Sequence, residues 1–435
     1  MNAGAYPGGS FARLRMTGSA GFIAIGLVTG VLAASLPAVD PARAGFSVER
    51  LDRVHQLLDG YVRDGKCAGA ITLIARDGGI ADVRVYGYRD LAAKLPMERD
   101  TLFYIFSLTK VAIAVTTLTL WEEGQFNLDD PVANYLPEFK NMKVITGGTP
   151  ENPELAEARP ITIRHLLTHT AGFAYDWNAG PLLKSSYERA DLFGIATLPE
   201  FARALAKIPL NHQPGDAFLY GASYDVLGYL IEKLTGQPLE AAMRERVFGP
   251  LAMNDTFFVV PPEKRGRLAK VHHRAADGYL EPTAPGTIVM AATGERAVFP
   301  SGSGGLVSTV DDYARFAQML LNRGELGGVR ILSPKTVAYM TRDHLTQIKT
   351  PTTFMGPAGT YGLGVGVWSA SGAGDSPGSA GRFGWTGAAT TYCNIDPQEG
   401  TVAMVFAQHF PYDEFGLFPR FSTTFYQAIV NSRAK

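Results

Sequence analysis

Strand-like sequence near both ends of this 435-residue chain restricts its fold more than any other feature. Residues 70–75 and 81–85 predict a pair of strands joined by a glycine-rich turn, and residues 383–395 and 401–408 predict further strands. Between them, residues 121–300 carry several helical patterns and proline-rich connections, typical of an inserted helical lobe. Because an isolated pair of strands is barely stable in water, we expect both ends of the chain to build one sheet.

These segments divide the chain into two lobes of one intertwined domain. We expect residues 45–120 and 301–435 to form an α/β lobe and residues 121–300 to form an all-helical lobe. Apolar residues at helical spacing from Leu51 to Val62 predict a helix before the first strand. Ligand sites are common where two such parts meet, so we expect a functional site at the seam between the lobes.

The first 44 residues differ in composition from the rest of the chain. Two arginines precede an uncharged stretch over residues 16–39, and the small-residue pattern Ala42-Arg43-Ala44 follows. This order predicts a signal peptide over residues 1–44, so that the mature, exported protein would begin near Gly45 in the periplasm or outside the cell. The alternative is an uncleaved membrane anchor, because the stretch is long enough to span a bilayer.

The charges and the cysteines narrow the class of protein further. Lysine plus arginine (40) nearly balance aspartate plus glutamate (41), and no run of like charges would follow a phosphate backbone, which argues against a nucleic-acid partner. Cys67 and Cys393 lie in or beside apolar, strand-like sequence, where a cysteine is more often a small buried hydrophobe. An oxidising compartment would permit a disulfide, but we expect two free, buried thiols. The sequence does not indicate an oligomeric state.

The pattern Ser107-Leu108-Thr109-Lys110 opens a strongly apolar segment that runs to about Leu120. On a helix, residues three apart share one face, so the lysine amine can reach the serine hydroxyl. A serine becomes a nucleophile when an adjacent base takes its proton, and a partly buried lysine can be that base. The alternative is a serine that caps the helix beside a solvated lysine. The same pattern recurs at residues 432–435, where we interpret it as accidental.

A second serine motif is a poor candidate for a nucleophile. Gly374-Asp375-Ser376-Pro377-Gly378 matches the Gly-x-Ser-x-Gly elbow of α/β-hydrolases. That elbow uses the backbone N–H after the serine to bind the oxyanion, and Pro377 has no N–H. We therefore expect Ser376 to be no nucleophile and its glycine-rich surroundings to form a surface loop.

The histidine pairs do not indicate a metal site. His165 and His169 have the spacing of two zinc ligands on one helix, but no glutamate lies between them and no third ligand suggests itself. We expect His272 and His273 to form a surface pair. No metal and no cofactor are predicted.

Four further motifs follow Ser-x-x-Lys along the chain: Leu-Leu-Thr-His-Thr-Ala-Gly-Phe (166–173), Tyr-Gly-Ala-Ser-Tyr-Asp-Val-Leu-Gly (220–228), Gly-Gly-Leu-Val-Ser-Thr-Val-Asp (304–311) and Gly-Trp-Thr-Gly (384–387). Together they resemble the serine β-lactamase-related family, and within it the class C-like branch that includes the family VIII esterases. The resemblance extends from about Phe46 to the C-terminus. It implies the mixed α/β (α+β) fold of β-lactamases and penicillin-binding proteins, in which helices flank an antiparallel sheet beside an all-helical lobe.

The resemblance also implies roles for individual residues. Ser107 would be the acylated nucleophile, Lys110 its base partner and Tyr220 the group that passes a proton to the leaving group. A phenol beside an ammonium group can share one proton with it, so the last two would act as a unit. Trp385-Thr386-Gly387 occupies the place of the family's Lys-Thr-Gly strand. The N–H of Ala388 would join that of Ser107 in binding the oxyanion.

Two departures from the family pattern bear on the substrate. Trp385 replaces the lysine, and Ala222 replaces the asparagine of Tyr-x-Asn, so two polar groups that β-lactamases direct at their substrate are missing. The esterases of the family are more similar at both places. We therefore expect a serine hydrolase, a carboxylesterase that cleaves small-molecule esters with short or small acyl groups through a Ser107 acyl-enzyme. The alternatives are a β-lactamase or D-amino-acid peptidase, with Arg382 replacing the missing cation, and a penicillin-binding sensor without turnover.

Overall fold

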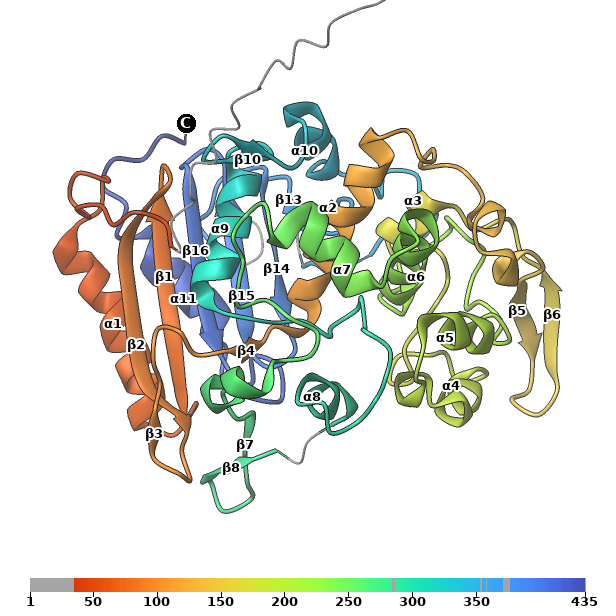
Figure 1. The fold of residues 1–435 in the computed structure, drawn as a ribbon, viewed down its shortest axis with the longest axis horizontal. Helices are drawn as coiled ribbons and strands as arrows, with labels where there is room; N and C mark the ends of the chain where they lie inside the picture. The colour runs from red at the N-terminus through yellow and green to blue at the C-terminus, as the bar shows by residue number, and fades with distance from the viewer. Residues whose placement is uncertain (1–34, 284–285, 353, 357, 371–375, 435) are drawn as a thin grey trace, which may run out of the picture. The chain divides into compact units, whose positions relative to one another are not determined.

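The computed structural model describes residues 35–283, 286–352, 354–356, 358–370 and 376–434 (Figure 1). The described residues form one compact unit, and the division into two intertwined lobes stays a prediction. Most of the predicted signal peptide lies outside the described residues. Within the described ranges, no helix is both long and apolar enough to cross a membrane.

An eight-stranded antiparallel sheet organises the protein, with the strand order β12-β13-β14-β15-β16-β1-β2-β3. The strands are β1 (Gly69–Arg76), β2 (Gly79–Asp90), β3 (Leu95–Pro96), β12 (Gly359–Tyr361), β13 (Gly366–Trp368), β14 (Arg382–Gly387), β15 (Thr391–Asp396) and β16 (Thr401–Ala407). Strand β1 pairs with β16 through seven residue pairs from Ala70↔Ala407 to Arg76↔Thr401. The prediction that the two ends of the chain share one sheet is therefore confirmed.

Helices cover both faces of this sheet. On one face, α1 (Val48–Arg63) and α11 (Leu417–Tyr426) pack against alternate residues of β1 and β16, among them Ile74 and Val405. On the other face, the intervening residues, among them Leu73 and Met404, join the core formed with α2 (Thr109–Glu122) and α9 (Val310–Leu321). Because both faces are covered, every residue of β1 and β16 is buried, and apolar residues lie on both faces of these strands. Helix α2 is buried on all sides from Thr109 to Leu120, which explains why Lys110 is the one charged residue in that stretch.

The inserted segment is helical only in part. It contains α3 (Ile163–Leu167), α4 (Lys184–Ala190), α5 (Leu198–Leu205), α6 (Ser223–Thr235), α7 (Leu239–Met243) and α8 (Thr287–Ala292). It also contains two hairpins, β5 (Lys143–Gly148) with β6 (Pro153–Glu157) and β7 (His272–Arg274) with β8 (Leu280–Pro282). The remaining elements are the pair β4 (Phe103–Tyr104) with β9 (Val307–Ser308), the hairpin β10 (Glu325–Leu326) with β11 (Val329–Arg330), and α10 (Pro334–Met340). The expectation of an all-helical lobe over residues 121–300 was therefore too simple.

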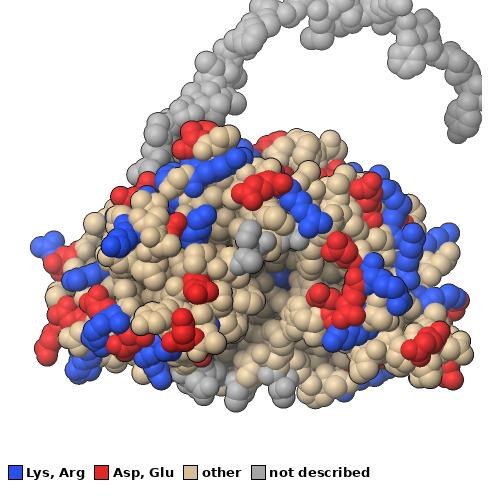
Figure 2. Space-filling model, turned by 90° about the horizontal axis from the view of Figure 1, so that it is seen from below, with Lys and Arg blue, Asp and Glu red and all other residues tan. Residues whose placement is uncertain are grey.

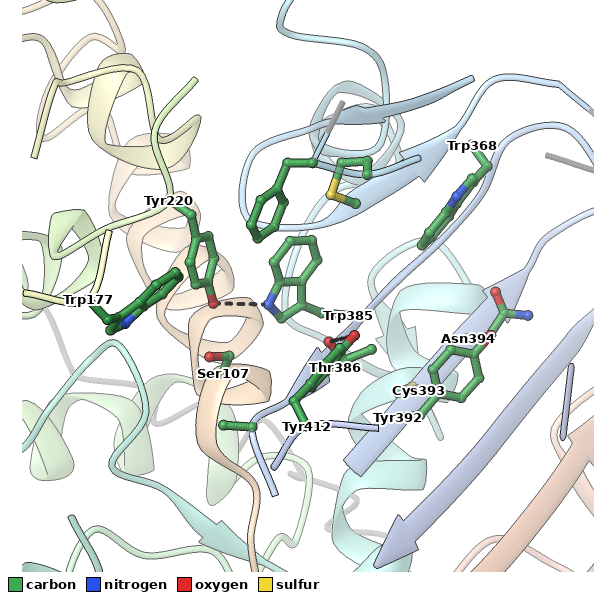
Figure 3. Close-up of a pocket in the computed structure, with 13 residues that line it drawn as sticks. Ser107, Trp177, Tyr220, Trp368, Trp385, Thr386, Tyr392, Cys393, Asn394 and Tyr412 are labelled. Atoms are coloured by element: carbon green, nitrogen blue, oxygen red, sulfur yellow. Dashed lines mark hydrogen bonds between the residues drawn. The ribbon is translucent and has the colours of Figure 1, made fainter. Parts of the chain in front are cut away.

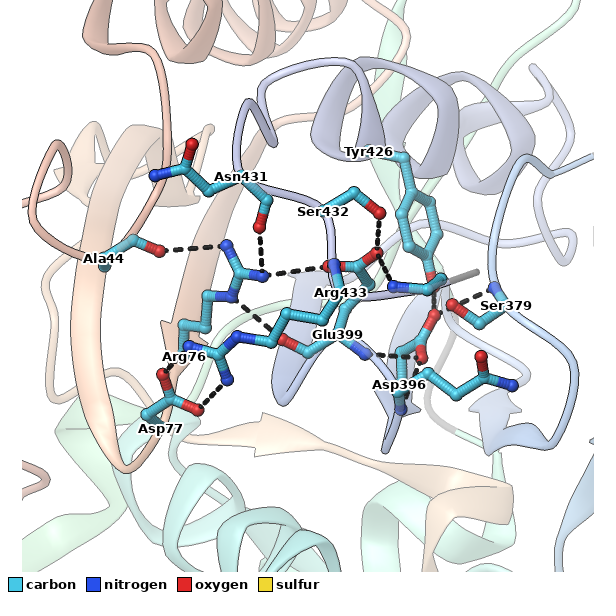
Figure 4. Close-up of polar contacts among 12 residues, drawn as sticks. Ala44, Arg76, Asp77, Ser379, Asp396, Glu399, Tyr426, Asn431, Ser432 and Arg433 are labelled. Carbon is cyan, nitrogen blue, oxygen red and sulfur yellow. Dashed lines mark hydrogen bonds and ion pairs between the residues drawn. The ribbon is translucent and has the colours of Figure 1, made fainter.

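A buried guanidinium joins segments from both ends of the chain (Figure 4). Arg76, at the end of β1, has a fully buried side chain and pairs with the Glu399 carboxylate at 2.9 Å. It also donates to the backbone oxygens of Glu399 (2.8 Å), Asn431 (2.8 Å) and Ala44 (3.0 Å). A buried charge is tolerated when it is paired and its remaining donors are satisfied, and both conditions are met here. This contact fixes the C-terminal segment and residue 44 against the sheet.

The residues just before α1 also belong to the folded unit. Leu36 is 5% exposed and lies in the main core. Val39 donates its N–H to the Ile80 oxygen at 2.9 Å, and Ile80 donates to the Pro37 oxygen at 2.8 Å, so this segment runs parallel to the start of β2. Residues 37–39, which the composition places in the signal peptide, therefore pair with the start of β2, and residues 41–45 follow as a turn.

Candidate active site

Ser107 lies where the sheet core meets the inserted segment, with Tyr220 and Trp385 beside it (Figure 3). Ser107 is in a single 3-10 turn, Phe106–Leu108, that leads directly into α2. The Lys110 ammonium donates to Ser107 Oγ at 3.2 Å and to the Ser303 oxygen at 2.6 Å. Ser107 is half-buried, whereas Lys110 is only 1% exposed. The spacing thus predicted the contact correctly, and the catalytic roles of both residues stay predictions.

The backbone just before the nucleophile candidate is strained and firmly held. Phe106 has φ = +43°, in the left-handed region that an L-residue adopts at a cost of about 1–2 kcal/mol. The neighbouring chain compensates, because Ile105 donates its N–H to the Leu306 oxygen at 3.1 Å and Leu306 donates to Thr109 Oγ1 at 3.1 Å. Strained positions persist only where the surroundings determine them, so the Ser107 hydroxyl is presented by a rigid turn.

Tyr220 approaches this pair from the segment that precedes α6. The centre of its ring lies 4.6 Å from Lys110 Nζ, and its hydroxyl accepts a hydrogen bond from Trp385 Nε1 at 3.3 Å. The histidine of the Thr-His-Thr motif fixes the adjacent backbone, since Gly221 donates its N–H to His169 Nδ1 at 3.3 Å. Three of the recognised motifs therefore meet around one tyrosine.

Strand β14 forms the opposite wall and ends directly beside Ser107. A Cβ on Gly387 would lie 2.3 Å from the Ile105 oxygen, so only glycine permits this approach. Thr391 donates from Oγ1 to the same oxygen at 3.3 Å. Ala388 and Thr386 line the same cavity as Ser107, and Thr386 Oγ1 lies 3.1 Å from the Tyr412 hydroxyl. The oxyanion role of the Ala388 N–H stays a prediction.

The cavity beside Ser107 has a volume of about 510 Å³ and an aromatic lining. Its described lining residues are Ser107, Trp177, Tyr220, Phe354, Met355, Trp368, Trp385, Thr386, Ala388, Tyr392, Cys393, Asn394 and Tyr412. None of these side chains is a lysine, arginine, aspartate or glutamate. The face of the molecule seen in Figure 2 has one marked hollow, and acidic and basic side chains lie mainly around it. Among the described residues, the cavity wall therefore offers hydroxyls and rings in place of charges.

Arg382 does not replace the missing lysine in this structure. Its side chain is buried at the start of β14, where Nη1 donates to the Gly378 oxygen at 3.2 Å and to the Ser379 oxygen at 3.3 Å. Its guanidinium carbon lies 5.2 Å from the centre of the Trp368 ring. Trp368 lines the cavity and Arg382 does not, so the Trp368 ring separates the Arg382 guanidinium from the cavity.

The serine and histidines outside the recognised catalytic motifs are held by hydrogen bonds or packing that stabilise the fold. Ser376 is 8% exposed, and its Oγ lies 2.6 Å from Ser422 Oγ, away from the Ser107 cavity. His165 Nδ1 accepts from the Thr162 N–H within the cap of α3, which is a structural use of the imidazole. The expectation of a surface pair was wrong for His272, which is 1% exposed because its hairpin packs beside Gln408.

Both cysteines are buried and free, as expected. Burial raises the pKa of the Cys67 thiol to about 12, which keeps the thiol protonated at neutral pH.

Sequence reasoning missed the aromatic residues that complete the cavity. Trp177, Phe354, Trp368 and Tyr412 come from separate loops and a short strand, and no motif marks them. What distinguishes three of them in the structure is that they are large aromatic residues left exposed: Trp177 at 65%, Phe354 at 50% and Tyr412 at 51%. Exposure of this kind is visible only in the folded protein.

Comparisons with known proteins agree with this geometry. The β-lactamase family model matches residues 54–420. The chain is 35% identical to protein Rv1367c of Mycobacterium tuberculosis over 80% of this chain and 87% of that protein, and 33% identical to esterase EstB of Burkholderia gladioli over 82% and 89%. Among solved structures, EstCE1, described as a hydrolase with promiscuous acyltransferase activity, superposes with a TM-score of 0.74 at 26% identity over 88% of this chain and 98% of that chain. The chain therefore belongs to the β-lactamase family, in its esterase-like branch, and is a serine hydrolase.

Proposed function

We propose that the protein is a carboxylesterase that hydrolyses neutral esters with a short or small acyl group through an acyl-enzyme on Ser107. The observation that carries this proposal is the uncharged, aromatic cavity wall that meets Ser107, Lys110 and Tyr220. Esterase EstB, which is similar over most of its length, supports the same general chemistry.

The proposed reaction has two half-reactions. Ser107 Oγ adds to the ester carbonyl carbon while its proton passes to the Lys110–Tyr220 pair, and the N–H groups of Ser107 and Ala388 stabilise the oxyanion. The bond from the carbonyl carbon to the alcohol oxygen then breaks, and the alcohol leaves with a proton from that pair. Water adds to the acyl-enzyme by the same route, and the carboxylic acid is released as Ser107 regains its proton.

The size of the cavity suggests which region binds the acyl group of the ester and which binds the alcohol part. A volume of about 510 Å³ exceeds what an acetyl or butyryl group can fill. We therefore propose that the small acyl group lies beside Ser107, and that a larger, apolar alcohol part occupies the aromatic remainder between Trp385 and Trp368. Burial of apolar surface there would add about 25 cal/mol per Å².

The same lining disfavours the alternative substrates. Penicillins and D-Ala-D-Ala peptides carry a carboxylate, and a charge-assisted hydrogen bond to it contributes about 1.5–3 kcal/mol. Without a cation in the described lining, roughly ten- to a hundredfold in selectivity for such substrates is lost. A sensor without turnover would share the nucleophile and differ in whether water releases the acyl group.

One experiment separates these functions. The protein is incubated with a fluorophosphonate and its intact mass is measured, and then p-nitrophenyl acetate and butyrate, nitrocefin and a D-Ala-D-Ala peptide are compared by kcat/KM. We expect one adduct, on Ser107, and kcat/KM for the neutral esters far above that for the carboxylate-bearing substrates. A better rate with nitrocefin or the peptide would overturn the esterase assignment. An acyl-enzyme that persists with every substrate would identify a sensor.

We also propose that the protein is exported and that the signal peptide ends before Leu36. The sequence pattern favoured cleavage after Ala44, but residues 36–44 pack on the sheet, and the Ala44 oxygen accepts a hydrogen bond from the buried Arg76. Cleavage there would leave the Ile80 N–H without its partner at Pro37 and would expose core surface. The small residues at 33–35 offer an earlier cleavage position.

A further inference from the structure

Lys110 is a buried cation whose immediate partners are neutral. Its side chain is 1% exposed and donates to a serine hydroxyl and to the Ser303 backbone oxygen. An ammonium group removed from water either loses its proton or requires an opposite charge nearby. A carboxylate from the surrounding elements would satisfy this requirement.

Asp225, in the first turn of α6, is the carboxylate on the other side of Ser303. It is fully buried, and its Oδ1 accepts from Ser301 Oγ at 2.8 Å and from the Ser303 N–H at 3.0 Å. Its Oδ2 accepts from Ser303 Oγ at 2.6 Å. The Ser303 carbonyl thus accepts a hydrogen bond from Lys110, while the N–H and the hydroxyl of Ser303 both donate to the Asp225 carboxylate.

The loop that carries these serines has almost no room to move. A Cβ on Gly302 would lie 2.3 Å from the Tyr224 oxygen, so the loop is pressed against the first turn of α6. Three donors on one carboxylate stabilise its ionised form. Burial raises the pKa of Asp225 above its ordinary value, while these hydrogen bonds and the charge of Lys110 act in the opposite direction.

Three phenols and one imidazole around Lys110 are held in their neutral forms by burial. Burial raises the pKa of the phenols of Tyr175, Tyr224 and Tyr361, and burial lowers the pKa of the His169 imidazole. The rings of Tyr220 and Tyr175 face Lys110 Nζ at 4.6 and 5.7 Å. Among the carboxylates of the described residues, Asp225 is the one that Ser303 joins to Lys110.

We propose that Asp225 is a positioning residue of the Ser107 site, which fixes the Ser303 carbonyl for Lys110 and supplies the counter-charge of its ammonium group. Asp225 acts through Ser303 and does not touch the substrate. The inference rests on the proposed Ser107 chemistry and adds the residue that determines how readily Lys110 gives up its proton. None of the family motifs used above assigns it this role.

The sign of the expected effect follows from the charge. A nearby anion stabilises the protonated lysine, so its removal makes the unprotonated, reactive state of the Lys110–Tyr220 pair available at lower pH. In Asp225→Asn, we expect the acidic limb of the pH–rate profile to move down by about one pH unit, the lower end of what a close opposite charge produces. A structural disturbance of the site without a change in charge would lower the rate at every pH and would not move the acidic limb of the profile along the pH axis.

The experiment measures the rate of fluorophosphonate labelling of the full chain against pH, for the wild type and each variant. Asp312→Asn is the matched control, because Asp312 is also a buried carboxylate, 5% exposed, that accepts from Thr256 Oγ1 and the Asp255 N–H in another part of the core. The acidic limb of the pH–rate profile of Asp312→Asn should coincide with that of the wild type. Asp225→Glu keeps the charge and should retain the wild-type limb even if its rate falls.

The outcomes are distinct. If the wild type is not labelled on Ser107, the proposed function fails; if it is labelled and the Asp225→Asn limb does not move, the role of Asp225 is refuted. Thermal unfolding checks that each variant is folded. If Asp225→Asn does not fold, Ser303→Ala, which removes one donor to the carboxylate and keeps the backbone carbonyl, should move the limb in the same direction by a smaller amount. An unchanged limb in that variant would also refute the proposal.

Discussion

Removal of one hydroxyl, in Tyr220→Phe, tests the proposed proton path most directly. The ring should stay in place, because its contact with Lys110 Nζ at 4.6 Å and its stacking with Phe354 at 5.2 Å do not use the hydroxyl. The change also removes the acceptor for Trp385 Nε1, and a buried donor left unpaired costs about 1–3 kcal/mol of stability.

The expected loss of activity is larger than this structural effect. General acid–base catalysis by a positioned group contributes about 10²–10⁴-fold, so kcat/KM for p-nitrophenyl butyrate should fall on the order of a hundredfold or more. Lys110→Ala should lose a similar amount, and the double variant little more, because members of one proton-transfer unit are not additive. Fully multiplicative losses would show that the two residues act separately.

Tyr187→Phe is the matched control for Tyr220→Phe. Tyr187 is also a buried tyrosine, 3% exposed, and its hydroxyl accepts from the Ala174 N–H at 2.9 Å without lining the Ser107 cavity. It should lose a similar free energy of unfolding in urea and keep its kcat/KM. If both variants retain kcat/KM within about tenfold of the wild type, below what general acid–base catalysis contributes, the Tyr220 hydroxyl is not the proton shuttle.

Four further predictions can be measured independently. Ser107→Ala should abolish ester turnover while Ser376→Ala keeps it, and substantial activity in the first variant would exclude the mechanism. Glu399→Ala leaves the buried Arg76 without its counter-charge and should lower the free energy of unfolding by about 3–5 kcal/mol in urea titrations, whereas a loss below about 1 kcal/mol, typical of an exposed pair, would contradict this. N-terminal sequencing of the protein from the periplasmic or extracellular fraction should find a start within residues 34–36, and a start at Gly45 or at Met1 would refute this assignment. With a fixed acetyl group, kcat/KM should rise as the neutral alcohol part becomes larger and more apolar, and it should fall when the acyl chain is lengthened instead.

Local periodicity explains why much of the framework could be predicted from the sequence. The Ser107–Lys110 spacing predicts a shared helix face wherever that segment is helical, and the structure brings the two side chains to 3.2 Å. The apolar runs at both ends of the chain require partners, and β1 pairs with β16. These features follow from residues close together in the chain, whose geometry the backbone fixes.

The same local reasoning failed where packing, and not composition, decides the backbone path. The sequence predicts strand structure throughout residues 383–395, yet the chain turns back after Gly387 to form β14 and β15, with Thr390 at φ = +64°. The sequence there contains no strong turn signal apart from Gly387 itself. The hairpin that buries His272 was missed for a related reason, since its burial depends on the distant residue Gln408.

By itself, the sequence determined the sheet built from both ends, the Ser-x-x-Lys helix and the order of motifs that identifies the family. Only the tertiary structure decided which side chains face the nucleophile. It assembled the aromatic cavity from separate loops, put Arg382 behind Trp368 and set Asp225 on the far side of Ser303 from Lys110. The physical reason is that these contacts join residues far apart in the chain, and their geometry depends on how whole elements pack rather than on local spacing.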